Sequence, residues 1–329
     1  MVRSAYNSTF GAKKYYNHQT HLIWNAPEQA GDLQVANQRA LGIVFGVGAG
    51  AMWAVEAVLG KMLFPSLTFL QVTASEVFFA TLTAFVYIIV RREHVRLSRK
   101  NIRGCLIIGL VGTVFAPLMY FLGLTQTFAV NATLIAHLQP LFVAIFGVYL
   151  LKESLHKHEF AAGGAVILAV VLITGRTVDN LANLRLGNTG DLVTFLATLG
   201  WAIVAIPGKQ LTREVDSAVI VGYRFLIASA VFMPILLFLN QLYIGSIYQV
   251  LLGVVVGLGY IFYYEGLKRL KASQVALTEL SSPFFAAILA WHFLGETTTP
   301  MQVAGALLLM LGLYVLAQGR PDSEEPVRH

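Results

Sequence analysis

The chain has 329 residues, of which 57% are hydrophobic and only 12% are charged. Its mean hydropathy of +0.68 excludes an ordinary soluble domain, whose surface must face water. The formal net charge of +6 does not indicate a nucleic-acid partner, because Lys and Arg lie at the ends of apolar segments, where membrane topology places them. These properties predict a polytopic membrane protein.

Residues 1–40 form a polar tail without the apolar core of a signal peptide, so we expect the first span to direct membrane insertion. Ten apolar runs follow, each about 20 residues long, which is the length that a helix needs to cross about 30 Å of hydrocarbon. A second polar tail covers residues 319–329. The expected spans are 41–62, 66–90, 102–124, 128–151, 158–175, 190–209, 216–239, 246–267, 271–294 and 299–318.

The rear parts of the two halves of the chain carry the same sequence pattern. Residues 134–153 (LIAHLQPLFVAIFGVYLLKE) superpose without a gap on residues 277–296 (LTELSSPFFAAILAWHFLGE). This alignment places Pro140 opposite Pro283. A repeat of this length indicates that one structural unit occurs twice in the chain.

The front parts of the two halves also match. Residues 42–61 align with residues 190–209, which places Trp53 opposite Trp201. The register slips by five residues between front and rear, and the longer basic segment of the first half (RREHVRLSRKNIR) accounts for the slip. Each half holds five expected spans, and an odd number gives the second half the opposite orientation in the membrane. The sequence therefore predicts inverted repeats, an arrangement that secondary transporters use.

The distribution of basic residues predicts which ends of the spans face the cytoplasm. With a cytoplasmic N-terminus, the inside loops and span ends hold 13 Lys and Arg residues, whereas the outside ones hold three. Cytoplasmic loops carry such an excess in multi-pass proteins. We therefore expect a protein of the cell membrane with both termini in the cytoplasm.

Two sequence features resemble the EamA-type branch of the drug/metabolite transporter superfamily. One is a proline-containing span that ends in LKE or LGE and precedes an apolar, Gly-containing span (LGETTTPMQVAGALLLMLGLYVL); the other is WA near the start of each half. The resemblance covers residues 41–318. It implies an all-α membrane fold of ten helices, arranged as inverted five-helix repeats at residues 41–176 and 190–318. It also implies a central cavity and the export or exchange of small metabolites.

Five titratable side chains lie well inside the expected spans, namely Glu56, Glu76, His137, Arg224 and Glu279. An ionised group in the bilayer interior costs about 3 kcal/mol or more, so each group needs a partner, a water-filled cavity or a function. Glu76 and Arg224 occupy the same position of the repeat. They are either a charge pair that gates or contacts substrate, or a pair that holds the bundle together.

Trp53 and Glu56 are three residues apart and therefore share one helix face. A carboxylate beside an indole suits an amine group, through charge and cation–π attraction. The alternative is that Trp53 packs between helices while Glu56 bonds a neighbouring span or points toward the outer interface.

Aromatic residues are also enriched at membrane interfaces. We expect interface anchoring, rather than an aromatic cage, for Tyr260, Tyr263 and Tyr264.

Pro140 and Pro283 are expected to bend their helices and to free carbonyl groups that can face a cavity. His137 and Glu279 lie about one turn before these prolines, and either could bind a coupling proton. Hydrogen bonds between helices would explain such polar residues without transport. The further polar residues expected along the substrate path are Asn131, Gln274 and Thr278.

Nothing in the sequence indicates a cofactor, a metal site or an enzyme. Cys105 is the only cysteine and lies in an expected span, so one chain can form neither a disulfide nor a thiolate metal site. The GVGAG segment at residues 46–50 resembles a dinucleotide loop, but no strand precedes it. Its glycines are better explained by close packing of helices.

The combined expectation is a secondary transporter of a small polar metabolite, an amino acid or related amine, working by alternating access as a monomer or homodimer. Glu56, Glu76 and Glu279 against Arg224 alone favour a positively charged substrate or coupling proton. One alternative is proton-coupled efflux of hydrophobic cations, as in small-multidrug-resistance exporters, with Glu56 as the shared site. Another is a non-transporting sensor or assembly protein whose working part is residues 1–40.

Overall fold

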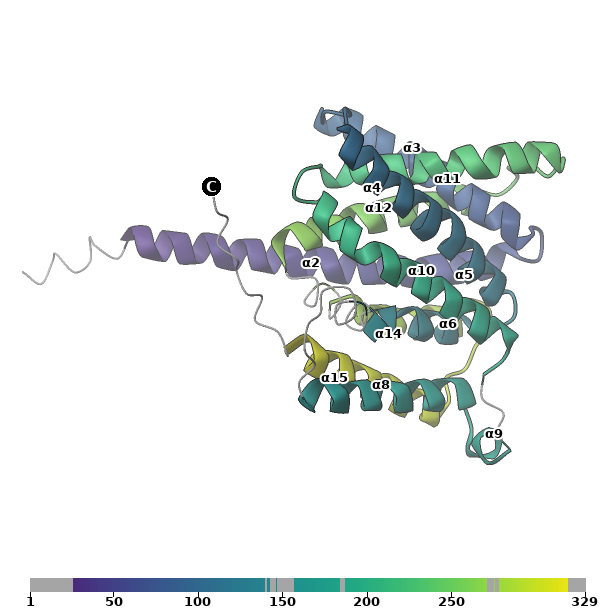
Figure 1. Ribbon diagram of the computed structural model, residues 1–329. Coiled ribbons are helices and arrows are strands. Elements are labelled where there is room, and N and C mark those ends of the chain that lie inside the picture. Colours follow the sequence, from purple (N-terminus) through teal and green to yellow (C-terminus); the bar gives the residue numbers. More distant parts are fainter. Residues whose placement is uncertain are drawn as a thin grey trace, which may run out of the picture. The chain divides into compact units, whose positions relative to one another are not determined.

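The structure is a computed structural model that describes residues 26–139, 141–142, 146, 157–183, 187–270, 275 and 278–318. Every regular element in these ranges is a helix (Figure 1). The chain divides into a unit of residues 1–40 and a unit of residues 41–329. The described part of the first unit is helical from Ala26 onward.

The helices of the first half are α2 (Ala26–Leu63), α3 (Phe69–Arg91), α4 (Arg99–Gly109), the π-helical turn η1 (Leu110–Phe115), α5 (Ala116–Leu124), α6 (Ala129–Ala136), α8 (Lys157–Gly175) and the short α9 (Val178–Ala182). Those of the second half are α10 (Thr189–Leu211), α11 (Ser217–Phe238), α12 (Ile247–Arg269), α14 (Ser281–Leu294) and α15 (Pro300–Gln318).

Each expected span contains helix, which confirms an all-α, multi-pass membrane fold. The expected spans 128–151 and 271–294 lie partly outside the described residues, as do Pro140 and Gln274. Six helical segments are by themselves long and apolar enough to cross a membrane: Asn37–Leu63, Phe69–Arg91, Arg99–Leu124, Thr189–Leu211, Ser217–Phe238 and Ile247–Arg269.

The expected span 102–124 is not one regular α-helix, because the π-helical turn η1 separates α4 from α5. Pro117 lies at the start of α5 and has no N–H to donate to the carbonyl four residues before it. The N–H of Ala116 instead bonds the Val111 carbonyl, five residues back. A π-bulge of this kind lets the helix pass the proline without ending.

The fourth span of each half is interrupted at equivalent positions. α6 ends at Ala136, and His137 leaves the helix with ψ of 6°. In the second half Leu280, which aligns with His137, has ψ of −9° and precedes α14. The repeated prolines explain both interruptions, since each lies three residues later in the sequence and cannot bond the preceding turn. Pro283 lies in the first turn of α14. The N–H groups of a first turn have no acceptor within their helix, so a proline is tolerated there.

The helix contacts follow the two-fold relation between the halves. Three contacts join equivalent spans, namely α3 with α11, α6 with α14, and α8 with α15, and Figure 1 shows the last pair side by side. The contact of α3 with α12 has its counterpart in that of α11 with α4. Likewise α10 packs against α5 and α6, as α2 packs against α12 and residues 278–281. This pattern fits inverted repeats around a pseudo-two-fold axis.

Glycines that the two halves share permit these close contacts. A Cβ on Gly190 would lie 2.6 Å from the Gly123 carbonyl, and a Cβ on Gly123 would lie 2.7 Å from the Gly190 carbonyl. Their repeat equivalents also face each other, because a Cβ on Gly266 would lie 3.6 Å from the Gly42 carbonyl oxygen. Small residues let helix backbones approach in this way.

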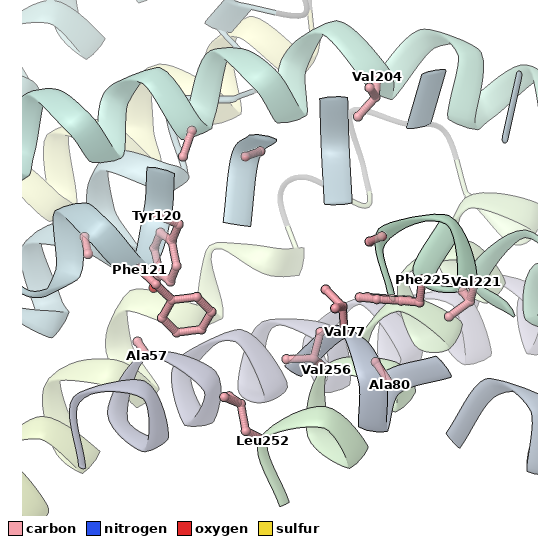
Figure 2. Packing of buried hydrophobic residues seen from close by; sticks show 14 of the residues in the cluster. Ala57, Val77, Ala80, Tyr120, Phe121, Val204, Val221, Phe225, Leu252 and Val256 are labelled. Atoms are coloured by element: carbon pink, nitrogen blue, oxygen red, sulfur yellow. The ribbon is translucent and has the colours of Figure 1, made fainter. Parts of the chain in front are cut away.

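The centre of the bundle is packed with apolar side chains from both halves. Figure 2 shows Phe121 of α5 near Ala57 of α2, and Phe225 of α11 near Val77 of α3. In the lipid bilayer such packing, rather than exclusion of water, holds helices together.

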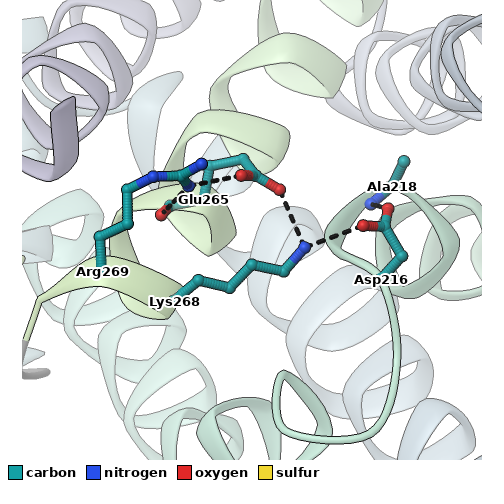
Figure 3. A network of polar contacts seen from close by, with 5 residues as sticks. All are labelled: Asp216, Ala218, Glu265, Lys268 and Arg269. Carbon is teal, nitrogen blue, oxygen red and sulfur yellow. Dashed lines mark hydrogen bonds and ion pairs between the residues drawn. The ribbon is translucent and has the colours of Figure 1, made fainter. Parts of the chain in front are cut away.

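Charged residues cluster at the end of α12. Lys268 bonds both Glu265, at 3.0 Å, and Asp216, at 2.8 Å, and Arg269 bonds Glu265 as well (Figure 3). Asp216 also caps α11 by accepting the N–H of Ala218 at 2.9 Å. This network ties the start of α11 to the end of α12.

Candidate functional site

A half-buried carboxylate and an indole meet between the two halves. The Nε1–H of Trp53, on α2, donates to Oε1 of Glu279 at 2.8 Å. The Trp53 ring packs edge-on against Tyr260 of α12, with 4.7 Å between ring centroids. Gly50 allows this approach, because a Cβ there would lie 3.1 Å from the Glu279 carbonyl oxygen. The indole that we predicted beside Glu56 thus binds a different carboxylate.

Glu56 and Glu76 form a second acidic group in the interior. Their side chains are 7% and 1% exposed, and they are close enough to act on each other electrostatically. Oε2 of Glu76 has no hydrogen-bond partner, and within the described ranges neither carboxylate forms an ion pair. Two acidic side chains at this depth of a membrane protein are costly when both are ionised, so this place favours a positive charge.

Arg224 is 2% exposed and is held by neutral groups. Nε donates to Oγ1 of Thr113 at 2.8 Å, Nη2 to the Gly112 carbonyl at 2.9 Å and Nη1 to the hydroxyl of Tyr264 at 3.2 Å. The guanidinium also stacks on Tyr260, 3.8 Å from the ring centroid. Arg224 and Glu76 interact electrostatically, but the described residues contain no ion pair between them.

His137 lies at the break of α6 and joins the two interrupted spans. Its Nδ1 is 2.7 Å from the Thr133 carbonyl, and its ring lies close to the backbone of Glu279. Pro283 has no N–H to bond the Glu279 carbonyl, which leaves that carbonyl open to other donors. Thr278, which we expected along the substrate path, donates its hydroxyl to the Val275 carbonyl at 2.7 Å.

Asn131 belongs to a separate buried network at the start of α6. Its Nδ2 is 3.4 Å from Oδ1 of Asp191, which also accepts the hydroxyl of Thr127 at 2.5 Å. Gln302 of α15 donates to Oδ1 of Asn131. Each polar group of Asn131 thus has a protein partner, as expected of a residue that bonds between helices.

Glu296 fastens the same end of α6 to the second half. Its carboxylate accepts the Ala129 N–H at 2.9 Å and pairs with Lys61 of α2 at 2.9 Å. Phe128, just before Ala129, lies beneath Arg176, whose guanidinium is 3.8 Å from the ring centroid. Lys61 approaches the same ring at 5.5 Å. A charged cluster therefore closes this end of the bundle.

The sequence analysis missed several residues of the interior. Tyr264 is buried against Arg224, so the prediction that it anchors the membrane interface is wrong. Trp201 packs at a tilt against Tyr120, with 5.4 Å between ring centroids, and its alignment with Trp53 was the signal that could have found it. Nothing in the sequence pointed to Thr113 as a partner of Arg224. Within the described residues, no cluster of metal-ligating side chains is found.

Comparison with known proteins agrees with this architecture. Residues 40–175 and 188–318 each match the EamA-like transporter family. The chain belongs to the EamA-like transporter family. This family is one of membrane transporters, as the sequence resemblance implied. The two matched ranges are the two halves of the internal repeat.

Three relatives illustrate the breadth of the family. An uncharacterized transporter of Methanothermobacter thermautotrophicus is 29% identical over 85% of this chain and 87% of its own length. The pseudopaline exporter CntI of Pseudomonas aeruginosa is 23% identical over 72% of this chain and 82% of its own. A probable amino-acid metabolite efflux pump of Salmonella typhimurium is 26% identical over 56% of this chain and 66% of its own.

A solved crystal structure shares the fold. Its TM-score against this chain is 0.63, over 86% of this chain and 98% of that one. At 19% sequence identity, this likeness speaks for the arrangement of helices and not for a substrate.

Proposed function

We propose that this EamA-like transporter exports a small polar metabolite bearing an amine, such as an amino acid, across the cytoplasmic membrane by alternating access. The observation that carries the proposal is the Glu279 carboxylate bound to the indole of Trp53 at 2.8 Å, beside Tyr260. A carboxylate among aromatic rings attracts an ammonium group through both charge and cation–π interaction.

The balance of charge in the interior supports a cationic group over an anionic one. Glu56 and Glu76 are buried and Glu279 is half-buried. Arg224 is the one buried arginine of the described residues, and it already donates to three neutral acceptors. A phosphate or sugar phosphate would meet repulsion there. Two relatives are named as a pseudopaline exporter and as a probable amino-acid metabolite efflux pump. Both names support export as the direction of transport.

The test is binding and counterflow with purified protein in liposomes, against amines, zwitterionic amino acids and organic phosphates. A ligand that binds only the folded state raises the melting temperature. We expect amines or amino acids to raise it, and Glu279→Gln to abolish that shift. Glu214→Gln, a change of an exposed glutamate, is the matched control. A shift with organic phosphates alone would overturn the proposal.

Proton-coupled efflux of hydrophobic cations is the second candidate, and the buried acidic pair Glu56 and Glu76 favours it. A shared acidic site would bind either a proton or the cation. Efflux of lipophilic cations that depends on a proton gradient and is lost in Glu56→Gln would support this candidate. Amine counterflow that survives Glu56→Gln without a pH gradient would exclude it.

A non-transporting role would place the function in the N-terminal tail. Deleting residues 1–25 leaves α2 whole, since α2 begins at Ala26. Transport by this truncated protein at the full-length rate would exclude residues 1–25 as the working part. Loss of a cellular function with intact transport in liposomes would support it.

A further inference from the structure

Trp201 is the repeat equivalent of Trp53, and the helices that carry the two indoles pack in equivalent ways. α2 approaches residues 278–281, where Gly50 faces the backbone of Glu279. α10 approaches α6 in the same manner, where Thr198, the equivalent of Gly50, donates its hydroxyl to the Ile135 carbonyl at 3.2 Å. The helices that carry the two indoles therefore approach corresponding places on the two interrupted spans.

The two indoles differ in what stands opposite their N–H groups. The Trp53 N–H donates to the Glu279 carboxylate at 2.8 Å. The residue that aligns with Glu279 in the first half is Ala136, which has no acceptor in its side chain. The Nε1–H of Trp201 is buried and has no hydrogen-bond partner. A buried donor without an acceptor is rare in native proteins and calls for an explanation.

The surroundings of Trp201 connect it to the acidic interior. Its ring packs at a tilt against Tyr120, and Tyr120 lies within electrostatic reach of both Glu56 and Glu76. A donor without an acceptor and two acidic side chains without an ion pair in the described residues thus share one region of the bundle. A molecule with one ammonium and one carboxylate would supply a partner to both.

We propose that the Trp201 N–H binds the carboxylate of a zwitterionic amino-acid substrate, which takes the place that Glu279 holds against Trp53. This inference rests on the proposed function and narrows its substrate from amines in general to amino acids. In the conformation described, the indole N–H is enclosed by protein. The alternation between two conformations that transport requires is what would open it to substrate.

The experiment compares ligands that differ only at the carboxylate. The probes are a panel of amino acids, each with its carboxamide and its decarboxylated amine, and the readout is the dissociation constant from ligand-induced thermal shifts. We expect the bound amino acid to exceed its amine in affinity by about tenfold, as a charge-assisted hydrogen bond provides. The carboxamide should lie between the two.

Trp201→Phe keeps the aromatic contact with Tyr120 and removes the N–H. We expect this variant to bind the amino acid and its amine with about equal dissociation constants, while the dissociation constant of the amine is unchanged. Ala136→Gln provides a second variant that keeps the indole and supplies an acceptor from the protein. It should abolish the same preference by satisfying the N–H internally.

The outcomes separate this inference from the proposed function. If amines and amino acids bind, but the preference for the carboxylate is absent or survives in both variants, the role of Trp201 is overturned and the amine transporter stands. If no probe of the panel binds, the proposed function fails and this inference with it. Loss of the preference in both variants supports the assignment.

Discussion

At the scale of single residues, the two repeat-related tryptophans offer a matched test of what a buried hydrogen bond contributes. Trp53→Phe removes the donor to Glu279 and leaves a half-buried carboxylate with one partner fewer. We expect it to destabilise the protein by about 1–3 kcal/mol. Trp201→Phe removes a donor that has no acceptor, so the melting temperature of the ligand-free protein in detergent should not fall. Equal losses in the two variants would contradict the assignment.

Sequence reasoning found most of the interior ionisable residues, because a charge inside an apolar run is conspicuous. It could not pair them. Glu279 meets Trp53 across 226 positions of sequence, and this contact depends on how α2 packs against the broken ninth span. Arg224 was expected opposite Glu76, yet its bonds go to Thr113, Gly112 and Tyr264. Local spacing carries no information on such long-range partners.

At the scale of helices, Glu296 joins the start of α6 to α2. Because Glu296 is buried, its ion pair with Lys61 should contribute to stability. Glu296→Gln keeps an acceptor for the Ala129 N–H but removes the charge that pairs with Lys61 at 2.9 Å. We expect it to destabilise the protein by about 1–3 kcal/mol.

Glu214→Gln is the control, because Glu214 pairs with Lys100 at the same 2.9 Å in a more exposed setting. The charge of Lys100 and its hydrogen bond lower the pKa of Glu214 below its ordinary value. Exposed pairs contribute little to stability, so thermal unfolding should show no measurable change. A larger loss in this variant than in Glu296→Gln would show that burial does not decide the effect.

Close packing of α12 against α3 gives a prediction on glycine. A Cβ on Gly253 would lie 2.8 Å from both the Glu76 carbonyl oxygen and the Ala80 nitrogen, and backbone cannot move aside cheaply. We expect Gly253→Ala to cost about 1–3 kcal/mol. Gly164→Ala is the control, because nothing lies within 4 Å of a Cβ there, and alanine favours a helix by about 1 kcal/mol. Melting temperatures should therefore move in opposite directions, and a shared direction would contradict this packing.

Helix positions were readable from the sequence because apolar length is a direct consequence of bilayer thickness. Interruptions within helices were less accessible. The mid-span prolines signalled a disturbance, but not that α6 ends at Ala136 or that Pro283 begins a helix. The π-helical turn before Pro117 depends on whether neighbouring helices hold the span straight, and that is a property of the packed bundle.

At the scale of the whole molecule, the inverted repeat makes a prediction that needs no substrate. Ser66 and Glu214 are equivalent positions of the two halves, and both are exposed in short loops after the first helix of each repeat. Because each half holds an odd number of expected spans, the two loops should lie on opposite sides of the membrane. The excess of basic residues predicts that Ser66 lies outside and Glu214 inside.

Single cysteines at these positions test the topology directly. Cys105 is buried and is replaced by serine in the background protein. A membrane-impermeant maleimide added to intact cells should label Ser66→Cys and leave Glu214→Cys unlabelled until the membrane is permeabilised. Labelling of both or of neither in intact cells would indicate parallel repeats and remove the pseudo-two-fold axis on which alternating access depends. The reverse pattern would keep the inverted repeat and place both termini outside.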